Sequence, residues 1–344
     1  MTRPLLISGA IGSPYTRKMK ALLLYRRIPY QFIAFNAVKD RNLPKTPLPL
    51  LPGIYIPEGE DGYRASSDST FQLRELEALY SGRSVLPTDS ALDFLAYLIE
   101  DFADEWLTKA MFYYRWGVSE NVDHASKLLP LWNLRVPDEF VEAFKNSFAQ
   151  RQIDRLSGVV AGSIEVSGPI LEASYQRLLV LLREHFKVQE FVLGQRPSAA
   201  DFGLHGQLTQ LVQVEPSSMA LARAEAPRVM AWVDVVDDLS GLDVTDGEGW
   251  VDRDALPDTF RELLGEIGRT YAPFMLGNHS ALERGNEQME CSIDGQPYWQ
   301  KSFPYQRKCL DWLREEYAKL EDRDRSFIDK TLSGTGCEAL VQAA

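Results

Sequence analysis

Residues 4–35 read PLLISGAIGSPYTRKMKALLLYRRIPYQFIAF, and this stretch decides the fold of the first part of the chain. A short apolar run that ends at Gly9 predicts a buried strand, and residues 30–35 predict a second one. Between the two strands, Ser13 has the residue type that caps helices, and Pro14 suits the first helical position. The stretch therefore predicts a β-α-β unit whose helix begins beside a hydroxyl group.

The predicted helix is basic. Residues 1–45 contain nine Lys and Arg and one acidic residue, a net charge of +8, although the whole chain carries −12. Free N–H groups at a helix start, with a basic flank, favour binding of an anion or a thiolate. An ordinary solvated helix surface is the alternative.

Composition limits the function further. A chain of 344 residues that is 45% hydrophobic and 25% charged predicts two or three globular domains. The negative net charge argues against nucleic acid and anionic membranes as partners. We expect a cytoplasmic protein, because no apolar run is as long as a membrane span and the first residues lack a signal-peptide pattern.

The cysteines and histidines predict no metal centre. Cys291, Cys309 and Cys337 lack CxxC spacing, which predicts reduced thiols, and the four histidines are scattered.

The periodicity along the chain predicts three parts. Residues 1–82 predict a small mixed-sheet domain, and residues 90–238 have helical periodicity throughout. After an acidic, glycine-bearing linker, residues 251–344 predict a mostly helical region with a hairpin at 289–300 around Asp294-Gly295. Further helices are predicted at 91–113, 137–158, 169–187, 198–213, 226–238, 257–284, 304–320 and 323–333. Ser198 and Asp201 predict a capping box at one of these starts.

This order of elements resembles the soluble glutathione transferase superfamily. The motifs that carry the resemblance are GSPYTRKMKALL at the first helix, Asp68-Ser69 before the third helix, and LGQRPSAADFGLHGQL in the helical part. It covers roughly residues 4–238 and implies an α/β thioredoxin-like domain that binds glutathione, followed by an all-α domain. It implies nothing about the last hundred residues.

By this resemblance, Ser13-Pro14-Tyr15 looks like the serine version of the family's motif, so Ser13 is the candidate for the hydroxyl that faces the glutathione sulfur, with Tyr15 also at the glutathione site. A thiol of pKa ~8.5 is only a few per cent ionised at pH 7. Lowering that pKa by two units takes ~2.7 kcal/mol, about what one charge-assisted hydrogen bond and a helix N-terminus supply together. A serine forms no mixed disulfide, which favours conjugation, addition–elimination or isomerisation. A helix cap without chemistry is the alternative.

The resemblance also implies a cis-proline just before the third strand, whose preceding residue pairs its backbone with glutathione. Pro49 and Pro52 are both candidates. We favour Pro52, with Leu51 making the contact, because Pro52 would otherwise lie inside an interior strand and remove a ladder hydrogen bond. A trans, proline-rich turn is the alternative.

Asp68-Ser69 matches the family's pair that binds the γ-glutamyl end of glutathione. A carboxylate suits the ammonium group, while Ser69 and a helix N-terminus suit the carboxylate. A simple N-cap cluster is the alternative. The lysine that many relatives place before the cis-proline is missing, and Lys39, Lys45 or Arg17 are open candidates for the glycine carboxylate.

The family's second-substrate pocket lies between the domains. By resemblance, the residues placed to line it are Phe102, Trp106, Tyr113 and Tyr114. They favour an aromatic or bulky apolar electrophile, whereas plain core packing is the alternative.

The sequence thus predicts a glutathione transferase-like enzyme with glutathione as co-substrate, a small electrophilic substrate and no metal. The resemblance alone implies a homodimer. The alternatives are a non-catalytic, protein-binding module of the same fold, and a specialised glutathione-dependent lyase, dehalogenase or isomerase. We expect residues 251–344 to pack on the outside of the helical domain, with a lid over the cleft as the alternative.

Overall fold

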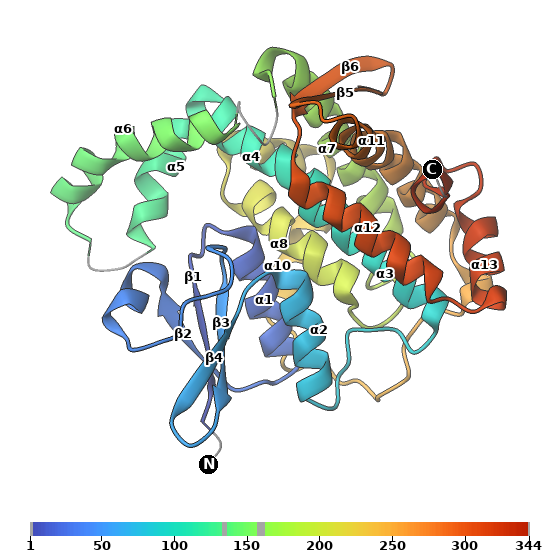
Figure 1. The fold of residues 1–344 in the computed structure, drawn as a ribbon, viewed down its shortest axis with the longest axis horizontal. Helices are drawn as coiled ribbons and strands as arrows, with labels where there is room; N and C mark the ends of the chain where they lie inside the picture. The colour runs from blue at the N-terminus through green and yellow to red at the C-terminus, as the bar shows by residue number, and fades with distance from the viewer. Residues whose placement is uncertain (1–2, 133–135, 157–161, 343–344) are drawn as a thin grey trace.

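The computed structural model describes residues 3–132, 136–156 and 162–342. Its first part is a four-stranded mixed sheet of order β2-β1-β3-β4, shown in blue in Figure 1. Strand β1 (Leu5–Gly9) is parallel to β2 (Tyr30–Ala34) and antiparallel to β3 (Gly53–Glu58), which is antiparallel to β4 (Gly62–Ser66). This is the thioredoxin-like arrangement that the sequence predicts.

Alternation along the strands divides the sheet into two faces. Leu5, Ile7 and Ile54 join the main core, to which helices α1 (Pro14–Tyr25) and α2 (Ser69–Leu79) also contribute. Leu6 and Tyr55 on the opposite face pack beside the short 3-10 helix η1 (Phe35–Asp40).

The second part is helical and centred on α8 (Ala199–Gln213), which is buried along nearly its whole length and packs against α1 and α3. The predicted capping box is present at its start, between Ser198 and Asp201. The remaining elements of this part are α3 (Ser90–Phe102), the π-helix η2 (Ala103–Leu107), α4 (Thr108–Gly117), α5 (Ser119–Leu131), α6 (Asp138–Arg155), α7 (Ile164–His185), α9 (Pro216–Glu225) and α10 (Pro227–Asp237).

The helical part differs from the predictions in three details. The helices α5 and α9 were not predicted, the helix predicted at 91–113 contains the π-helical turn η2, and α7 begins at Ile164 instead of residue 169. The error at α7 has a simple cause. Pro169 suits a first helical position, but here it lies inside a helix that begins after Ser163.

The C-terminal region consists of η4 (Arg253–Ala255), α11 (Asp258–Glu283), β5 (Gln288–Ile293), β6 (Gln296–Lys301), α12 (Pro304–Ala318), α13 (Asp322–Leu332) and α14 (Glu338–Val341). The predicted hairpin is confirmed: β5 and β6 pair in antiparallel register, and Asp294 and Gly295 both have positive φ. Helix α11 packs against α7, and α12 crosses in front of α3 (Figure 1). This region therefore packs on the helical part, as expected, but it also reaches the N-terminal domain, where Trp312 of α12 contacts Phe71 of α2.

The segment between the helical part and the C-terminal region is held by arginines. Arg196, which is 1% exposed, donates hydrogen bonds to the carbonyls of Thr245 and Glu248 and to that of Ser84. Arg83 donates to the carbonyls of Leu239 and Leu242. This linker is thus fastened to the body of the protein. Within the described residues, no helix has the length and apolar composition needed to cross a bilayer.

Candidate functional site

Three strand ends meet at one edge of the sheet. Ser8 pairs with Gly53, and Ile54 pairs with Ser66, so the end of β1, the start of β3 and the end of β4 are neighbours. Helix α1 follows β1, and α2 follows β4, so both helices begin at this edge. The fold therefore gathers the segments that contain Ser13, Pro52 and Asp68, although they are far apart in the sequence.

Ser13 is the N-cap of α1 and is partly exposed. Its hydroxyl oxygen accepts a hydrogen bond from the backbone N–H of Thr16 at 3.4 Å. Because this bond uses only a lone pair of the oxygen, the hydroxyl hydrogen can still be donated to a ligand. The hydroxyl thus has the hydrogen-bond capacity that a thiolate needs.

The turn before Ser13 is fixed by buried groups. The Arg115 guanidinium forms an ion pair with Glu215 and donates a 2.7 Å hydrogen bond to the carbonyl of Gly12. A Cβ atom at Gly12 would lie 2.7 Å from the ring of Trp132 and 3.0 Å from Cγ of Leu129. A larger residue here would have to displace the Trp132 ring, so the end of α5 lies directly against the turn that presents Ser13.

The peptide bond between Leu51 and Pro52 is cis, and it is the only cis bond among the described residues. Of the two candidate prolines, Pro52 therefore has the conformation that the resemblance implies. The carbonyl of Pro52 accepts a 2.8 Å hydrogen bond from Nε2 of Gln72, which also donates to the carbonyl of Ser66 at 2.9 Å. Gln72 thus ties the cis-proline to the end of β4. The contact between Leu51 and glutathione stays a prediction.

Asp68 and Ser69 lie at the start of α2. Asp68 is its N-cap, has a φ of 78°, and accepts a 3.2 Å hydrogen bond from the N–H of Thr70 through Oδ1. Such a positive φ is uncommon for a residue with a side chain. The other oxygen, Oδ2, accepts a hydrogen bond from the hydroxyl of Tyr305 in α12. Ser69 is buried, and its hydroxyl accepts a 3.3 Å hydrogen bond from Nζ of Lys18.

Lys18 belongs to this arrangement, although the sequence predicts it only as part of a basic helix surface. It is fully buried, and Nζ lies 2.7 Å from Oε1 of Glu100 and 2.5 Å from Oδ2 of Asp104. Burial alone would lower the pKa of Lys18, but the two carboxylates outweigh it and raise that pKa. Its spacing of four residues from Leu22, on the apolar face of the helix, was the available signal.

Tyr15 faces the helical part. Its hydroxyl donates to the carbonyl of Asp104 at 2.8 Å and lies 3.3 Å from the hydroxyl oxygen of Thr108. Burial raises its pKa well above the usual value. This hydroxyl therefore joins α1 to the helices behind it. A role for Tyr15 in binding glutathione stays a prediction that these contacts do not favour.

The four side chains expected at a second-substrate pocket are buried in the core. The Phe102 ring meets Tyr271 at 6.2 Å, and Trp106 lies 5.5 Å from Phe274 while its indole N–H donates to Ser174. The remaining contacts join Tyr113 to Glu172 and Tyr114 to Tyr175. Core packing, the alternative stated above, describes all four, because α11 and β6 fill the space beside Phe102 and Trp106.

The three candidates for binding the glycine carboxylate of glutathione differ in the contacts they make within the protein. Arg17 donates to the carbonyl of Ile11 and lies 3.5 Å from Asp237. Lys39 and Lys45 are exposed on the segment that precedes the cis-proline. The choice among them stays open.

A cluster of buried acids, which was not predicted from the sequence, lies in α3 and η2 beside α1. Burial raises the pKa of Asp101 to about 7, that of Asp104 to about 6, and that of Glu105 well above its usual value. Burial likewise lowers the pKa of Lys109 to about 7. The signal of this acidic cluster in the sequence is the run EDFADE, residues 100–105, within an otherwise apolar helix stripe.

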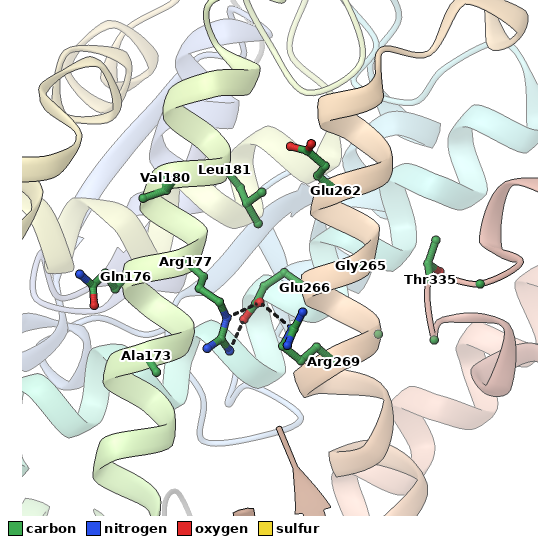
Figure 2. A pocket seen from close by; sticks show the side chains of 13 residues that line it. Ala173, Gln176, Arg177, Val180, Leu181, Glu262, Gly265, Glu266, Arg269 and Thr335 are labelled. Carbon is green, nitrogen blue, oxygen red and sulfur yellow. Dashed lines mark hydrogen bonds and ion pairs between the residues drawn. The ribbon is translucent and has the colours of Figure 1, made fainter. Parts of the chain in front are cut away.

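A cavity of about 950 Å³ lies elsewhere, between α7, α11 and the loop at 334–336. Figure 2 shows Arg177 and Arg269 on either side of Glu266, with both guanidinium groups directed at its carboxylate. The lining of the cavity also includes Glu262, so its two arginines and two glutamates give a net charge of zero. None of the lining residues belongs to the sheet edge. Among the described residues, no three His, Cys, Asp or Glu side chains are placed to hold a metal ion.

Residues 8–84 match the family model described as the glutathione S-transferase N-terminal domain. The matched segment includes Ser13, the cis-proline and Asp68. Over residues 8–84 the N-terminal domain is thus similar to the glutathione S-transferase family, and the resemblance found in the motifs is confirmed there. A comparison with curated proteins finds no match.

Solved structures of similar fold include the β-etherase LigF from Sphingobium sp. strain SYK-6, with a TM-score of 0.47, 15% identity, and coverage of 68% of this chain and 95% of that one. A glutathione S-transferase from Methylobacterium radiotolerans, in complex with glutathione sulfonate, has a TM-score of 0.41 and 17% identity, with coverage of 71% and 99%. Another from Rhodospirillum rubrum F11 has a TM-score of 0.41 and 15% identity, with coverage of 73% and 98%. Likenesses at these TM-scores do not bear on activity.

Proposed function

We propose that the chain binds glutathione at the sheet edge and that Ser13 stabilises the glutathione thiolate, which attacks a small electrophile. The observation that carries this proposal is the convergence of three features at one edge. They are a partly exposed serine at the start of α1, a cis bond before β3, and Asp68-Ser69 at the start of α2. The N-terminus of α1 suits the negative charge of the thiolate, and the N-terminus of α2 suits the carboxylate of the γ-glutamyl group.

The thiolate chemistry follows from the groups present. Ser13 donates its hydroxyl hydrogen to the sulfur, and the N-terminal N–H groups of α1 favour the negative charge. The cysteines of the chain are Cys291, Cys309 and Cys337, all in the C-terminal region, and burial raises the pKa of each thiol. With serine in the capping position, the reacting thiol belongs to the ligand. Conjugation or addition–elimination is therefore favoured over thiol–disulfide exchange.

An apolar or aromatic electrophile is the substrate class we propose. The apolar surface beside Ser13 comes from Leu129 and Trp132 at the end of α5, both partly exposed and both against Gly12. In this proposal, these two residues replace the four buried side chains that the resemblance implies for the pocket. A homodimer and a cytoplasmic location remain predictions from the sequence.

A non-catalytic, protein-binding module is the second candidate. The observation that favours it is the 950 Å³ cavity that the C-terminal region forms with α7, away from the sheet edge. The two candidates differ in one measurable property, which is the binding of glutathione.

The test is a calorimetric titration of the intact protein and of Ser13→Ala with glutathione, together with conjugation rates for a model aromatic electrophile. We expect both proteins to bind glutathione with similar affinity, and the variant to react about 10- to 100-fold more slowly, because it lacks one hydrogen bond to a charged sulfur. Ser163→Ala, at the N-cap of α7, is the matched control and should react normally.

Each outcome decides one point. No binding at millimolar glutathione would favour the protein-binding module. Binding with an unchanged rate in Ser13→Ala would remove Ser13 from the chemistry while leaving the binding site in place.

A further inference from the structure

The C-terminal region touches the predicted γ-glutamyl site through one side chain. Tyr305, in the first turn of α12, donates its hydroxyl hydrogen to Oδ2 of Asp68, across 237 residues of sequence. The second oxygen of the same carboxylate accepts from the N–H of Thr70 at 3.2 Å. Asp68 is thus held on one side by its own helix and on the other by α12.

The start of α12 is fixed in place. Asn278 of α11 accepts a 2.8 Å hydrogen bond from the N–H of Phe303 and donates a 3.0 Å bond to its carbonyl. Gln306 is buried and accepts a 3.1 Å hydrogen bond from Nε2 of Gln300 in β6. These bonds come before and after Tyr305, so its position is set by the C-terminal region and not by chance contact of a mobile end.

Contacts between aromatic rings also join α12 to the N-terminal domain. The Tyr305 ring meets Trp312 edge-on, with 6.0 Å between centroids, and Trp312 meets Phe71 of α2 edge-on at 4.7 Å. Phe71 lies three residues after Asp68. Helix α12 is therefore packed against the helix that Asp68 caps.

The hydrogen-bond capacity of this pair exceeds what the protein itself uses. A carboxylate has about four acceptor positions, and Asp68 uses one on each oxygen. Burial raises the pKa of Tyr305, so its hydroxyl keeps its hydrogen at neutral pH. With that hydrogen donated to Asp68, the lone pairs of the hydroxyl remain as acceptors. An ammonium group has three donors, and Asp68 with Tyr305 offers matching acceptors side by side.

We propose that Tyr305 is a ligand-binding residue of the glutathione site, which accepts a hydrogen bond from the α-ammonium of the γ-glutamyl group while donating to Asp68. This rests on the glutathione binding proposed above. The site is then built from the sheet domain and the C-terminal region together. It selects thiol peptides with a free α-amino group over those in which that group is blocked or missing.

The test compares Tyr305→Phe with the intact protein, because this change removes the hydroxyl and keeps the ring. For glutathione we expect the Kd to rise about tenfold or more. For des-amino glutathione, in which a glutaryl group replaces γ-glutamyl, we expect the same Kd in both proteins. Tyr317→Phe is the matched control. Tyr317 lies on the same helix as Tyr305, but its hydroxyl donates to Asp329 of α13 and not to Asp68, so this variant should bind glutathione normally.

Trp312→Leu is a second variant, because it loosens Tyr305 without changing the hydroxyl or Asp68. We expect it to weaken glutathione binding and to leave des-amino binding unchanged. Thermal unfolding of each variant verifies that it is folded. Equal or tighter glutathione binding by Tyr305→Phe would overturn this inference alone, and tighter binding would show that the hydroxyl competes with the ligand for Asp68. An intact protein that does not bind glutathione would overturn the proposed function, and this inference with it.

Discussion

At the residue scale, Lys18 forms two buried ion pairs beside the candidate site. It is the shared counter-charge of Glu100 and Asp104, and it also donates to Ser69 beside the predicted ligand. Because all these groups are buried, the lysine links α1, α2 and the helical part through charge and not only through packing. Loss of this ammonium leaves Asp104 without its ion-pair partner and Glu100 with Arg74 alone, at 3.2 Å, in a medium that solvates carboxylates poorly.

We therefore expect Lys18→Met to lower the free energy of unfolding by about 3–5 kcal/mol at pH 7. The loss should shrink toward pH 5, because Asp104, with a pKa of about 6, then takes up a proton and no longer needs the lysine. Urea unfolding at both pH values measures this. Lys20→Met on the same helix is the control. Lys20 is partly exposed over the Phe32 ring, and its replacement should cost less than about 1 kcal/mol. An equal cost for both variants would contradict this account.

The residues found from the sequence and those missed differ in the range of their contacts. Ser13, Pro52 and Asp68 have local signatures, since a cap type, a proline before a strand and an acid–serine pair are visible within a few positions. Lys18 and Tyr305 are defined by partners 86 and 237 residues away. No local pattern specifies which carboxylate a lysine or a tyrosine will meet. Those contacts follow from the packing of whole helices.

At the element scale, the π-helical turn η2 distinguishes the structure from the single long helix that the apolar stripe predicts. The helix runs from α3 through η2 to α4 without leaving helical conformation, but the wide turn alters the register of its side chains. Asp101, Asp104 and Glu105 are buried at this turn. Such turns recur at functional sites, and this one lies behind the α1 residues of the sheet edge.

Asp101 makes the stability of this element depend on pH. It accepts a hydrogen bond from Tyr271, and burial raises its pKa to about 7, above the unfolded value of ~3.9. The native state thus holds a proton that the unfolded state has lost, so this contribution to stability is present at low pH and is lost as the pH rises through 7.

We expect Asp101→Asn to be more stable than the intact protein at pH 8 by about 2–4 kcal/mol, with the difference vanishing near pH 4. Chemical unfolding at pH 4, 6 and 8 measures it. Asp322→Asn, at an exposed position of α13, is the control and should show no such trend. A difference that grows toward low pH would contradict the assigned direction.

The missed helices α5 and α9 show why periodicity fails for some elements. The buried positions of α5 are Asn121, Ala125, Ser126 and Pro130, and those of α9 are Ser218 and Ala222. Small and polar side chains give no apolar stripe, even where they face the protein. Helices with large buried residues, such as α8 and α11, were predicted within one residue at each end.

At the scale of the whole molecule, one hydrophobic core joins all three parts. It extends from Leu5 in the sheet through Trp106 in the helical part to Leu340 in the C-terminal region. The motif order predicted the first two parts. The sequence predicted packing of the third part on the helical part, but it could not show which side chains this interface covers, because the aromatic side chains of α3, η2 and α4 suit a substrate pocket and a core interface equally well in sequence. The structure uses Phe102 and Trp106 for the interface with α11 and β6.

This predicts that the C-terminal region is required for stability. A chain that ends at Trp250 would expose the rings of Phe102 and Trp106, which are 0% and 1% exposed in the full structure. We expect it to aggregate or to lose its cooperative thermal transition, and we expect the intact chain to unfold in one transition. Size-exclusion chromatography and scanning calorimetry measure both. A truncated chain that is monomeric and unfolds cooperatively would show that the helical part has a sufficient core of its own.

The interface around Trp106 also has a consequence for synthesis. A ribosome finishes Trp106 long before it makes Phe274 and Tyr298, the rings that cover it. The glutathione transferase-like part therefore emerges with an apolar face that nothing yet shields, and it keeps that face until the hairpin β5–β6 has been translated. We expect the nascent chain to be prone to aggregation during that interval, and pausing of translation between residues 240 and 300 would prolong the exposure.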